Sequence, residues 1–292
     1  MEKTWTPLSV LEWTTRRFED AGAESARLDA QVLLAHVLKC DRVHLYTHFD
    51  KPLAADELAA FRELIKRRLT GEPIAYVVGE KEFWSLPLAV DSRVLVPRPD
   101  TEVLVQVALD LARRSEPIYI ADIGTGSGAI AIALARELPN AQVIASDVSG
   151  GALEVAAANA ARHGVDDRIK LVMGDLMNGL PPTAQFHLLV ANLPYIPAGD
   201  IATLSPDVRH EPRAALDGGP DGLDLVRRLI GDAPSRIIAG GHIVLEHAPD
   251  QAQTVAGMLA DEFDDVITRK DLAGRARVTY AKQTAPTTLL AR

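Results

Sequence analysis

The stretch that decides the fold is ADIGTGSGAIAIALA, residues 121–135. Apolar residues before Gly124 predict a buried strand, and the alanine-rich run after Gly128 predicts a helix. The three glycines, Gly124, Gly126 and Gly128, let the backbone turn sharply and approach a ligand, while the start of the helix offers free N–H groups. Their Gly-x-Gly-x-Gly spacing differs from the Gly-x-Gly-x-x-Gly of dinucleotide-binding proteins, which weighs against a pyrophosphate cradle.

Acidic residues follow the next two predicted strands. Asp147 ends the second strand, where a carboxylate can accept both hydroxyl groups of a ribose. Gly174-Asp175 follows the third strand, where an adenine amino group would need an acceptor, although a simple turn or helix cap explains Asp175 equally well. These residues together predict a nucleoside site at the carboxyl ends of the strands.

The segment Asn192-Leu193-Pro194-Tyr195 follows the fourth predicted strand. Asn192 carries a side-chain carbonyl group, and Pro194 restricts Leu193 to extended backbone, which sets the direction of the Leu193 carbonyl. Tyr195 adds a flat ring. Two acceptors beside an aromatic plane form a receptor for a planar –NH2 group.

Around these segments, strands alternate with helices, which predicts an α/β fold with a mainly parallel sheet and helices on both faces. The predicted strands are 118–123, 142–147, 169–173, 186–191 and 242–246, followed by an antiparallel pair at 265–268 and 277–281. A further helix is predicted over 100–114. In such sheets ligands bind beyond the carboxyl ends of the strands, where the turns described above lie.

The first part of the chain predicts a small helical bundle. One helix begins at Pro7 after an N-cap at Thr6, and two more span 25–39 and 55–69, where apolar residues recur at helical spacing. The run EFWSLPLAVDSRVLV, 82–96, has β-formers on both sides of Asp91-Ser92, which predicts a hairpin linker with its turn there.

Composition excludes several classes of protein. The chain has 292 residues, 47% of them hydrophobic and 24% charged, which is typical of about two globular domains. A net charge of −9 argues against a general nucleic-acid-binding surface, and a single cysteine, Cys40, excludes an internal disulfide and fits a reducing compartment. We expect no signal peptide, no membrane span and a cytoplasmic protein. The pairs His210-Glu211 and Glu246-His247 lack a third ligand, so no metal is expected.

At this point the sequence resembles a known family. A Gly-x-Gly-x-Gly turn, a ribose acid and an Asn-Pro-Pro-Tyr-like tetrapeptide, in this order, resemble class I S-adenosylmethionine methyltransferases that act on planar nitrogen. The segments GEPIAYVVGEKEFW (71–84), VPRPDTE (96–102), HEPRAALDGGPDGL (210–223) and DLAGRARV (271–278) resemble the HemK/PrmC family of protein-glutamine N5-methyltransferases. This resemblance extends over nearly the whole chain.

The resemblance implies an architecture and a substrate. The implied fold is a Rossmann-like seven-stranded sheet with strand 7 antiparallel, in a methyltransferase domain over 98–292. Residues 1–80 would form a helical substrate-docking domain, and 81–97 a β-hairpin linker. The substrate would be the Gly-Gly-Gln glutamine of peptide-chain release factors, methylated by a monomer that contacts neither membrane nor specific nucleic acid, with S-adenosylhomocysteine as the second product.

The resemblance also assigns roles to residues. Five residues of the glycine turn would hold the methionine part of the cofactor: Gly124, Thr125, Gly126, Ser127 and Gly128. Asp147 would bind the ribose, and Asp175 with Leu176 would bracket the adenine. Asn192 and the Leu193 carbonyl would accept the two N–H bonds of the substrate amide, fixed by Pro194, with Tyr195 packed beside it. Asn192, which also borders the cofactor, and Tyr195 would be the catalytic residues.

Leu193 departs from the family pattern, which has proline at this position. The carbonyl acceptor survives the change, and some rigidity is lost. Three other functions stay open: glutamine methylation of a ribosomal protein, adenine-N6 methylation of a nucleic acid, and cofactor binding without methyl transfer.

Overall fold

The computed structural model describes residues 4–112 and 116–284, and the chain divides into two compact units. The first unit comprises residues up to Glu80 together with Ser205–His210, and the second comprises Lys81–Leu204 and the residues from Glu211 onward. The sequence does not predict that the short segment Ser205–His210 packs with the first unit. It does so by close contact, since a Cβ atom on Gly71 would lie only 3.0 Å from Cβ of Pro206.

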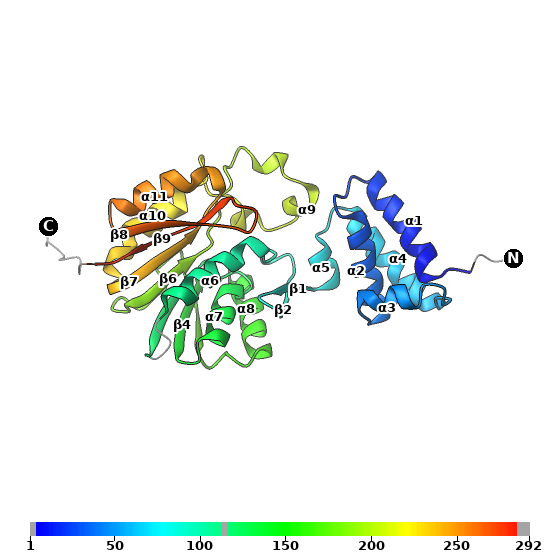
Figure 1. Ribbon diagram of the computed structural model, residues 1–292, viewed down its shortest axis with the longest axis horizontal. Coiled ribbons are helices and arrows are strands. Elements are labelled where there is room, and N and C mark those ends of the chain that lie inside the picture. Colours follow the sequence, from blue (N-terminus) through cyan, green and yellow to red (C-terminus); the bar gives the residue numbers. More distant parts are fainter. Residues whose placement is uncertain (1–3, 113–115, 285–292) are drawn as a thin grey trace. The chain divides into compact units, whose positions relative to one another are not determined.

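The first unit is a helical bundle (Figure 1). Its helices are α1 (Pro7–Asp20), α2 (Ala26–Leu38), α3 (Arg42–Thr47), α4 (Ala55–Leu69), α5 (Ile74–Val78) and α9 (Pro206–Arg209). The predicted cap at Thr6 is present: its hydroxyl accepts from the Ser9 backbone N–H, and the Ser9 hydroxyl accepts from the Thr6 backbone N–H. The short helices α3 and α5 escaped prediction, since five or six residues are too few to show helical periodicity.

A β-hairpin follows, formed by β1 (Glu80–Phe83) and β2 (Leu86–Ala89). The prediction of its turn at Asp91-Ser92 is wrong, because the chain reverses at Trp84-Ser85, whose φ angles are +52° and +56°. Two residues with positive φ make the tight turn that joins hairpin strands. Asp91 instead accepts hydrogen bonds from the Arg93 backbone and guanidinium.

The second unit contains a seven-stranded sheet. In chain order its strands are β3 (Ile118–Ile123), β4 (Ala141–Asp147), β5 (Ile169–Met173), β6 (Phe186–Ala191), β7 (Ile237–Glu246), β8 (Asp264–Lys270) and β9 (Ala276–Lys282). Their spatial order is β5-β4-β3-β6-β7-β9-β8. The first five are parallel, and β9, the seventh in chain order, runs antiparallel between β7 and β8, as expected.

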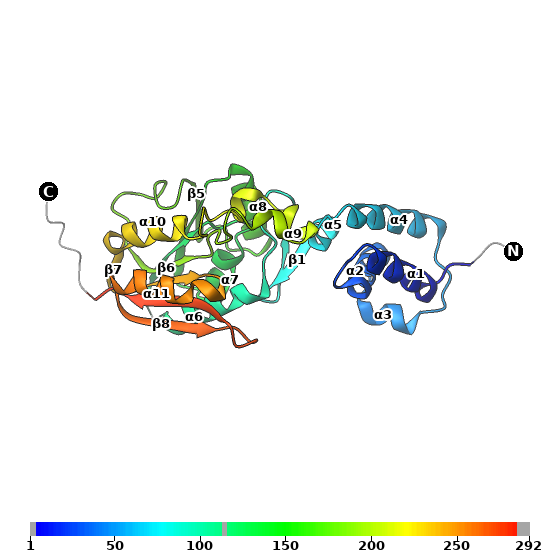
Figure 2. The same ribbon diagram turned by 90° about the horizontal axis from the view of Figure 1, so that it is seen from above.

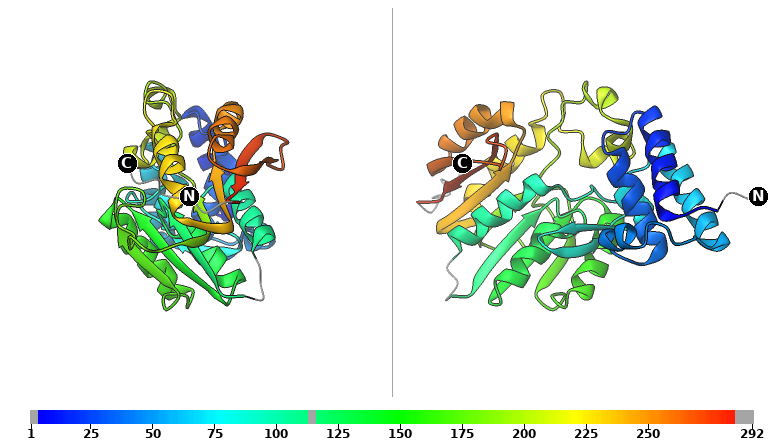
Figure 3. Two further views of the ribbon diagram at one scale, coloured as in Figure 1. Left: turned by 90° about the vertical axis from the view of Figure 1, so that its left-hand side faces the viewer. Right: turned by 45° about the vertical axis from the view of Figure 1, so that its right-hand side comes forward.

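Helices cover both faces of this sheet, and each face has its own apolar core (Figures 1 and 3). On one face lie α6 (Glu102–Leu111), α7 (Ala129–Glu137) and α8 (Gly150–Arg162). On the other lie α10 (Asp224–Asp232) and α11 (Ala252–Ala260), and in Figure 2 α11 lies along strand β8. Helix α6 ends at Leu111, and residues 113 and 114 of its predicted span lie outside the described residues.

Neighbouring strand residues point to opposite faces, which decides where the polar residues go. Ile120 packs in the core under α6 and α7, and Ala121 packs in the core under α10 and α11. The strand order reverses between β3 and β6: β4 and β5 continue the sheet on the β3 side, and β7 continues it on the β6 side. Ligands of doubly wound sheets bind at this point, beyond the carboxyl ends of the strands.

Candidate active site

The glycine turn joins β3 to α7. The backbone N–H groups of Gly124 and Thr125 both donate to the carbonyl of Ser146, at 2.8 and 2.9 Å, which anchors the turn to the end of β4. Gly124, Gly126 and Gly128 have φ angles of +75°, +54° and +82°, a region that favours glycine. A Cβ atom on Gly126 would meet nothing within 4 Å, so the turn presents bare backbone to open space.

Asp147 at the end of β4 is held by backbone on both carboxylate oxygens. Oδ2 accepts from the N–H of Gly126 and Oδ1 from the N–H of Ser149, each at 2.9 Å. A carboxylate oxygen has more than one lone pair, so both can still accept a ribose hydroxyl. The glycine turn and Asp147 are thus joined by a hydrogen bond.

Thr125 and Ser127 are buried, and the Thr125 side chain faces the protein interior. The Thr125 hydroxyl donates to Asp122 Oδ2 at 2.7 Å, and the Ser127 carbonyl accepts from Asn159 at 2.9 Å. Asp122 is fully buried and its Oδ1 has no partner among the described residues. Burial raises the pKa of Asp122 to about 7. The sequence analysis missed Asp122, although an acidic residue inside an apolar strand is a usable signal.

In the segment after β5, Leu176 is buried whereas Asp175 is half exposed. Leu176 is buried, has a φ of +53°, and its carbonyl accepts from the Ser146 hydroxyl at 3.1 Å, so it lies against the end of β4. The carboxylate of Asp175 is half exposed and pairs with Arg228 of α10 at 2.6 Å. The structure therefore brings Leu176 to the glycine turn and gives Asp175 an ion-pair partner that the sequence did not indicate.

The tetrapeptide lies beside the glycine turn because β6 pairs with β3 in register, Ala191 opposite Ile123. The next residues, Asn192 and Gly124, are consequently neighbours. Leu193 is buried, and its Cδ2 lies 3.1 Å from the position that a Cβ atom on Gly124 would take. Asn192 Nδ2 donates to the Thr101 hydroxyl at 3.1 Å, which leaves its carbonyl oxygen for another partner.

Tyr195 is only partly exposed, and it remains a neutral phenol at physiological pH. Burial and the nearby carboxylate of Glu246 raise the pKa of Tyr195 to about 12, against the opposing effect of Arg277. Its backbone carbonyl accepts from Gln251 Nε2 at 2.9 Å. Gln251 was missed in the sequence analysis, since nothing local in the chain connects it to Tyr195.

The loop 218–222 packs directly on the tetrapeptide. A Cβ atom on Gly218 would lie 2.6 Å from the Pro194 carbonyl oxygen, and one on Gly222 would overlap that of Tyr195. These glycines are required by close backbone approach. The loop thus packs against the Pro194 and Tyr195 backbone.

A polar cluster lies next to Asn192, formed by Thr101, Asp100, Glu246 and Arg277. Glu246 is 1% exposed and neither of its carboxylate oxygens makes a hydrogen bond within the described ranges. Burial raises the pKa of Glu246 to about 7, although the side chains of Thr101 and Asn192 and the charge of Arg277 lower it. Arg277 is buried and pairs with Asp100 at 2.9 Å.

The segment VPRPDTE, which carries Asp100 and Thr101, is tied down by Glu211. Glu211 is 4% exposed and accepts from the Val96 N–H at 2.9 Å and from the Arg98 guanidinium. Glu211 thus joins the segments VPRPDTE and HEPR, which lie far apart in the chain. Glu211 is thereby a structural ion-pair residue. Across the described part of the chain no group of His, Cys, Asp and Glu side chains could hold a metal ion.

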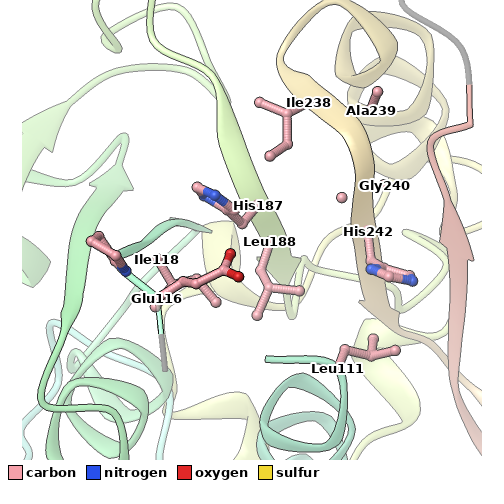
Figure 4. A pocket seen from close by; sticks show the side chains of 11 residues that line it. Leu111, Glu116, Ile118, His187, Leu188, Ile238, Ala239, Gly240 and His242 are labelled. Atoms are coloured by element: carbon pink, nitrogen blue, oxygen red, sulfur yellow. The ribbon is translucent and has the colours of Figure 1, made fainter. Parts of the chain in front are cut away.

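A small cavity of about 130 Å³ lies at the opposite edge of the sheet (Figure 4). Glu116, His187 and His242 surround it, at the amino ends of the strands. It contains none of the predicted site residues, and it lies at the amino ends of the strands, whereas ligands of parallel sheets bind at the carboxyl ends.

No helix in the described residues is long and apolar enough to cross a membrane.

Comparisons with known proteins identify the family to which the chain is similar. Residues 9–79 match the family model of the PrmC N-terminal domain, and residues 120–210 match that of a methyltransferase domain. A release factor glutamine methyltransferase of Rhodopirellula baltica is 44% identical over 283 residues, covering 94% of this chain and 95% of the relative. Its counterpart in Geobacter sulfurreducens is 46% identical over 276 residues, with coverage of 94% and 95%.

Solved structures show the same fold at low sequence identity. The hMettl16 catalytic domain, in complex with MAT2A 3′UTR hairpin 6, superposes with a TM-score of 0.58 at 15% identity, covering 76% of this chain and 83% of that one. A methyltransferase from Pyrococcus furiosus gives 0.53 at 19% identity, with coverage of 75% and 98%. Identities this low show the fold alone, whereas the two sequence relatives are far more similar and cover nearly the full chain. The chain is therefore a methyltransferase that belongs to the release factor glutamine methyltransferase (HemK/PrmC) family.

Proposed function

We propose that this enzyme transfers a methyl group from S-adenosylmethionine to the side-chain amide nitrogen, N5, of the glutamine in the Gly-Gly-Gln motif of peptide-chain release factors. The relatives named above support the release factor as substrate. The observation that carries the proposal is Asn192, whose amide nitrogen is engaged by Thr101 while its carbonyl oxygen stays available beside the glycine turn.

The residues of the turn fit the cofactor. Bare backbone at Gly126 leaves the room that the methionine part needs, with Gly124, Thr125, Ser127 and Gly128 shaping the turn. Asp147 keeps lone pairs for the ribose hydroxyls. Leu176 would cover the adenine, and Asp175 would have to give up Arg228 to accept from the adenine amino group. When bound, the cofactor supplies the methyl group on a sulfonium.

The protein's own contribution is to hold and polarise the amide. An amide nitrogen is a poor nucleophile because its lone pair is delocalised into the carbonyl. The Asn192 carbonyl oxygen and the Leu193 carbonyl, the latter directed by Pro194, would accept the two N–H bonds and stabilise positive charge that develops on nitrogen. Tyr195 would pack its neutral ring against the amide. One N–H proton leaves to solvent after the N–C bond forms, so no base is assigned.

We assign the remaining tasks by segment. Residues 1–80 would dock the release factor, 81–97 would serve as linker, and 98–292 would carry the methyltransferase chemistry. The enzyme would act as a monomer in the cytoplasm, where release factors work, without binding nucleic acid or membrane.

The test combines purified enzyme, S-adenosylmethionine and a release factor, followed by mapping of added methyl groups by peptide mass spectrometry. We expect one methyl on the Gly-Gly-Gln glutamine and none when that glutamine is changed to alanine. Parallel reactions contain ribosomal proteins and an adenine-containing oligonucleotide. Methyl on either of these, with the release factor unmodified, would replace the proposal.

If no substrate is methylated although the cofactor binds, the variant Leu193→Pro decides between two causes. Activity gained by this variant would attribute the loss to Leu193. Continued inactivity would favour a protein that binds the cofactor without transferring methyl groups.

A further inference from the structure

The buried carboxylate of Glu246 has no role in the reaction described so far. It is 1% exposed, and both oxygens lack a hydrogen bond to any described residue. Placing an unpaired carboxylate in the interior costs free energy, because the group loses its hydration without gaining partners. An unpaired buried carboxylate beside a candidate active site indicates a role in that site.

The register of the sheet places Glu246 beside Asn192. Ala191 of β6 pairs with Leu245 of β7, so Asn192 and Glu246 are the next residues on two parallel neighbours. Ala191 and Leu245 pack in the core under α10 and α11. Because side chains alternate, Asn192 and Glu246 both face the α6 side, where Thr101 stands directly before that helix.

Thr101 connects the two. Its hydroxyl oxygen accepts from Asn192 Nδ2 at 3.1 Å, so the hydroxyl hydrogen must point elsewhere. The Glu246 carboxylate is the acceptor available to that hydrogen, because its interactions with the Thr101 and Asn192 side chains favour the ionised form, although neither oxygen makes a hydrogen bond among the described residues. An ionised Glu246 can only accept. A protonated one could donate to Thr101, which would free the Thr101 hydroxyl to donate to the Asn192 carbonyl in the reversed orientation.

We propose that Glu246 is a positioning residue that, through Thr101, holds the Asn192 amide with its carbonyl oxygen toward the substrate nitrogen. This inference rests on the proposed function, because it concerns the acceptor that binds the glutamine amide. Asn192 can otherwise flip its amide end for end, which would present N–H groups to the substrate amide nitrogen, which itself offers only N–H groups. The carboxylate thus specifies one of two orientations of nearly identical shape.

The charged and titratable groups that influence Glu246 set the pH at which this device operates. Arg277 of β9 favours the ionised carboxylate, Asp100 before α6 opposes it, and Tyr195 stays neutral. With a pKa raised to about 7, Glu246 is ionised above neutrality and protonated below it. We therefore expect turnover to rise with pH through about 7, while cofactor binding does not follow the same curve.

The experiment measures kcat and cofactor Kd from pH 6 to 8.5 for the wild type, Glu246→Gln, Thr101→Val and Thr101→Ser. Glu246→Gln should lower kcat about tenfold or more at pH 8 and remove the rise near pH 7, with cofactor Kd changed less than about threefold, since groups that orient a ligand typically contribute factors of roughly 10–100. Thr101→Val should lose kcat similarly, and Thr101→Ser should restore it. Asp110→Asn, which removes an exposed carboxylate on α6 away from this cluster, should keep the wild-type pH profile.

A second measurement does not need turnover. In 15N NMR spectra, the side-chain NH2 signals of Asn192, assigned by their loss in Asn192→Ala, should shift with a midpoint near pH 7 in the wild type and stay constant in Glu246→Gln. The inference would be overturned if the Asn192 NH2 signals of the wild type did not shift with pH. It would also be overturned if Glu246→Gln kept the wild-type kcat and pH profile. An inactive wild type whose Asn192 signals do titrate would instead refute the proposed substrate alone.

Discussion

At the scale of single residues, the Leu193 side chain makes packing contacts that the shorter proline ring of the family pattern would not make. It is buried, packs in the core with Leu223 and Val226, and lies over Gly124. The tetrapeptide is thereby joined to the glycine turn through side-chain packing, where a ring at this position would have stiffened the backbone instead. This contact compensates in part for the rigidity that is lost with the proline of the family pattern.

Asn192 offers the sharpest test at this scale. Asn192→Ala removes one of the two proposed acceptors, so we expect kcat to fall about 100-fold, the usual effect of losing one preorganised polar group. Cofactor Kd, measured by calorimetry, should change less than about threefold. Asn140→Ala, an exposed asparagine in the turn before β4, is the control. Equal losses in kcat and in cofactor affinity would contradict the role given to Asn192.

The site residues that sequence reasoning found are those that immediately follow a strand. Gly124, Asp147 and Asn192 each lie at a strand end, where local pattern and parallel topology suffice to place them. Thr101, Gln251 and Glu246 were missed as site residues because their partners lie far away in the chain. Only the register of β6 with β7 reveals that Glu246 belongs beside Asn192.

At the scale of elements, β3, β5 and β6 have the bounds that the sequence predicts. Strand β7 begins at Ile237, earlier than predicted, because Ala239-Gly240-Gly241 reads as a break. The structure absorbs these residues in an irregularity where the register with β6 shifts between Phe186 and Leu188. The hairpin turn was misplaced because Trp84 and Ser85 are uncommon residues at positive φ.

Gly222 tests whether the loop 218–222 supports the tetrapeptide. Its φ is +79°, and an added Cβ atom would overlap the Tyr195 carbonyl oxygen, so Gly222→Ala must displace one of the two backbones. We expect kcat to fall at least about tenfold, since small displacements of reacting groups cost rates of this order. Thermal unfolding should also occur at a lower temperature.

The matched control is Gly257→Ala in α11, where a Cβ atom meets nothing within 4 Å. Alanine is favoured over glycine inside a helix by about 1 kcal/mol, so this variant should unfold at the same or a higher temperature and keep its kcat. If Gly222→Ala behaves like Gly257→Ala, the loop does not position the tetrapeptide.

At the scale of the whole molecule, the alternation of strands and helices and the C-terminal antiparallel pair were enough to predict the seven-stranded sheet. The association of Ser205–His210 with the helical unit was not predictable, because it depends on contacts such as Gly71 with Pro206 that lie far apart in the chain. The sheet could therefore be predicted from local sequence patterns. The polar cluster around Glu246 and the packing of Ser205–His210 with the helical unit could not, because both depend on contacts between distant parts of the chain.

The stability of the sheet should depend on pH through two of its buried carboxylates. Burial raises the pKa values of Asp122 and Glu246 from 3.8 and 4.5 to about 7. Between these limits these two carboxylates hold protons in the folded chain that they have lost in the unfolded chain, so their contribution to stability falls as pH rises from about 4 to about 7 and then levels off. At roughly 1.4 kcal/mol per pKa unit, each carboxylate lowers the free energy of unfolding by about 4 kcal/mol at most.

Hydrogen exchange of the most protected β3 amides, corrected for intrinsic exchange rates, measures this effect within the sheet. Comparing each variant with the wild type at pH 5 and pH 8 cancels the opposing effect of His242 and His247, whose pKa values burial lowers. Asp122→Asn and Glu246→Gln should each gain stability relative to the wild type at pH 8 over pH 5. Asp110→Asn, which removes an exposed carboxylate on α6, is the control. A wild-type difference equal to that of both variants would mean that neither carboxylate is protonated preferentially in the folded chain.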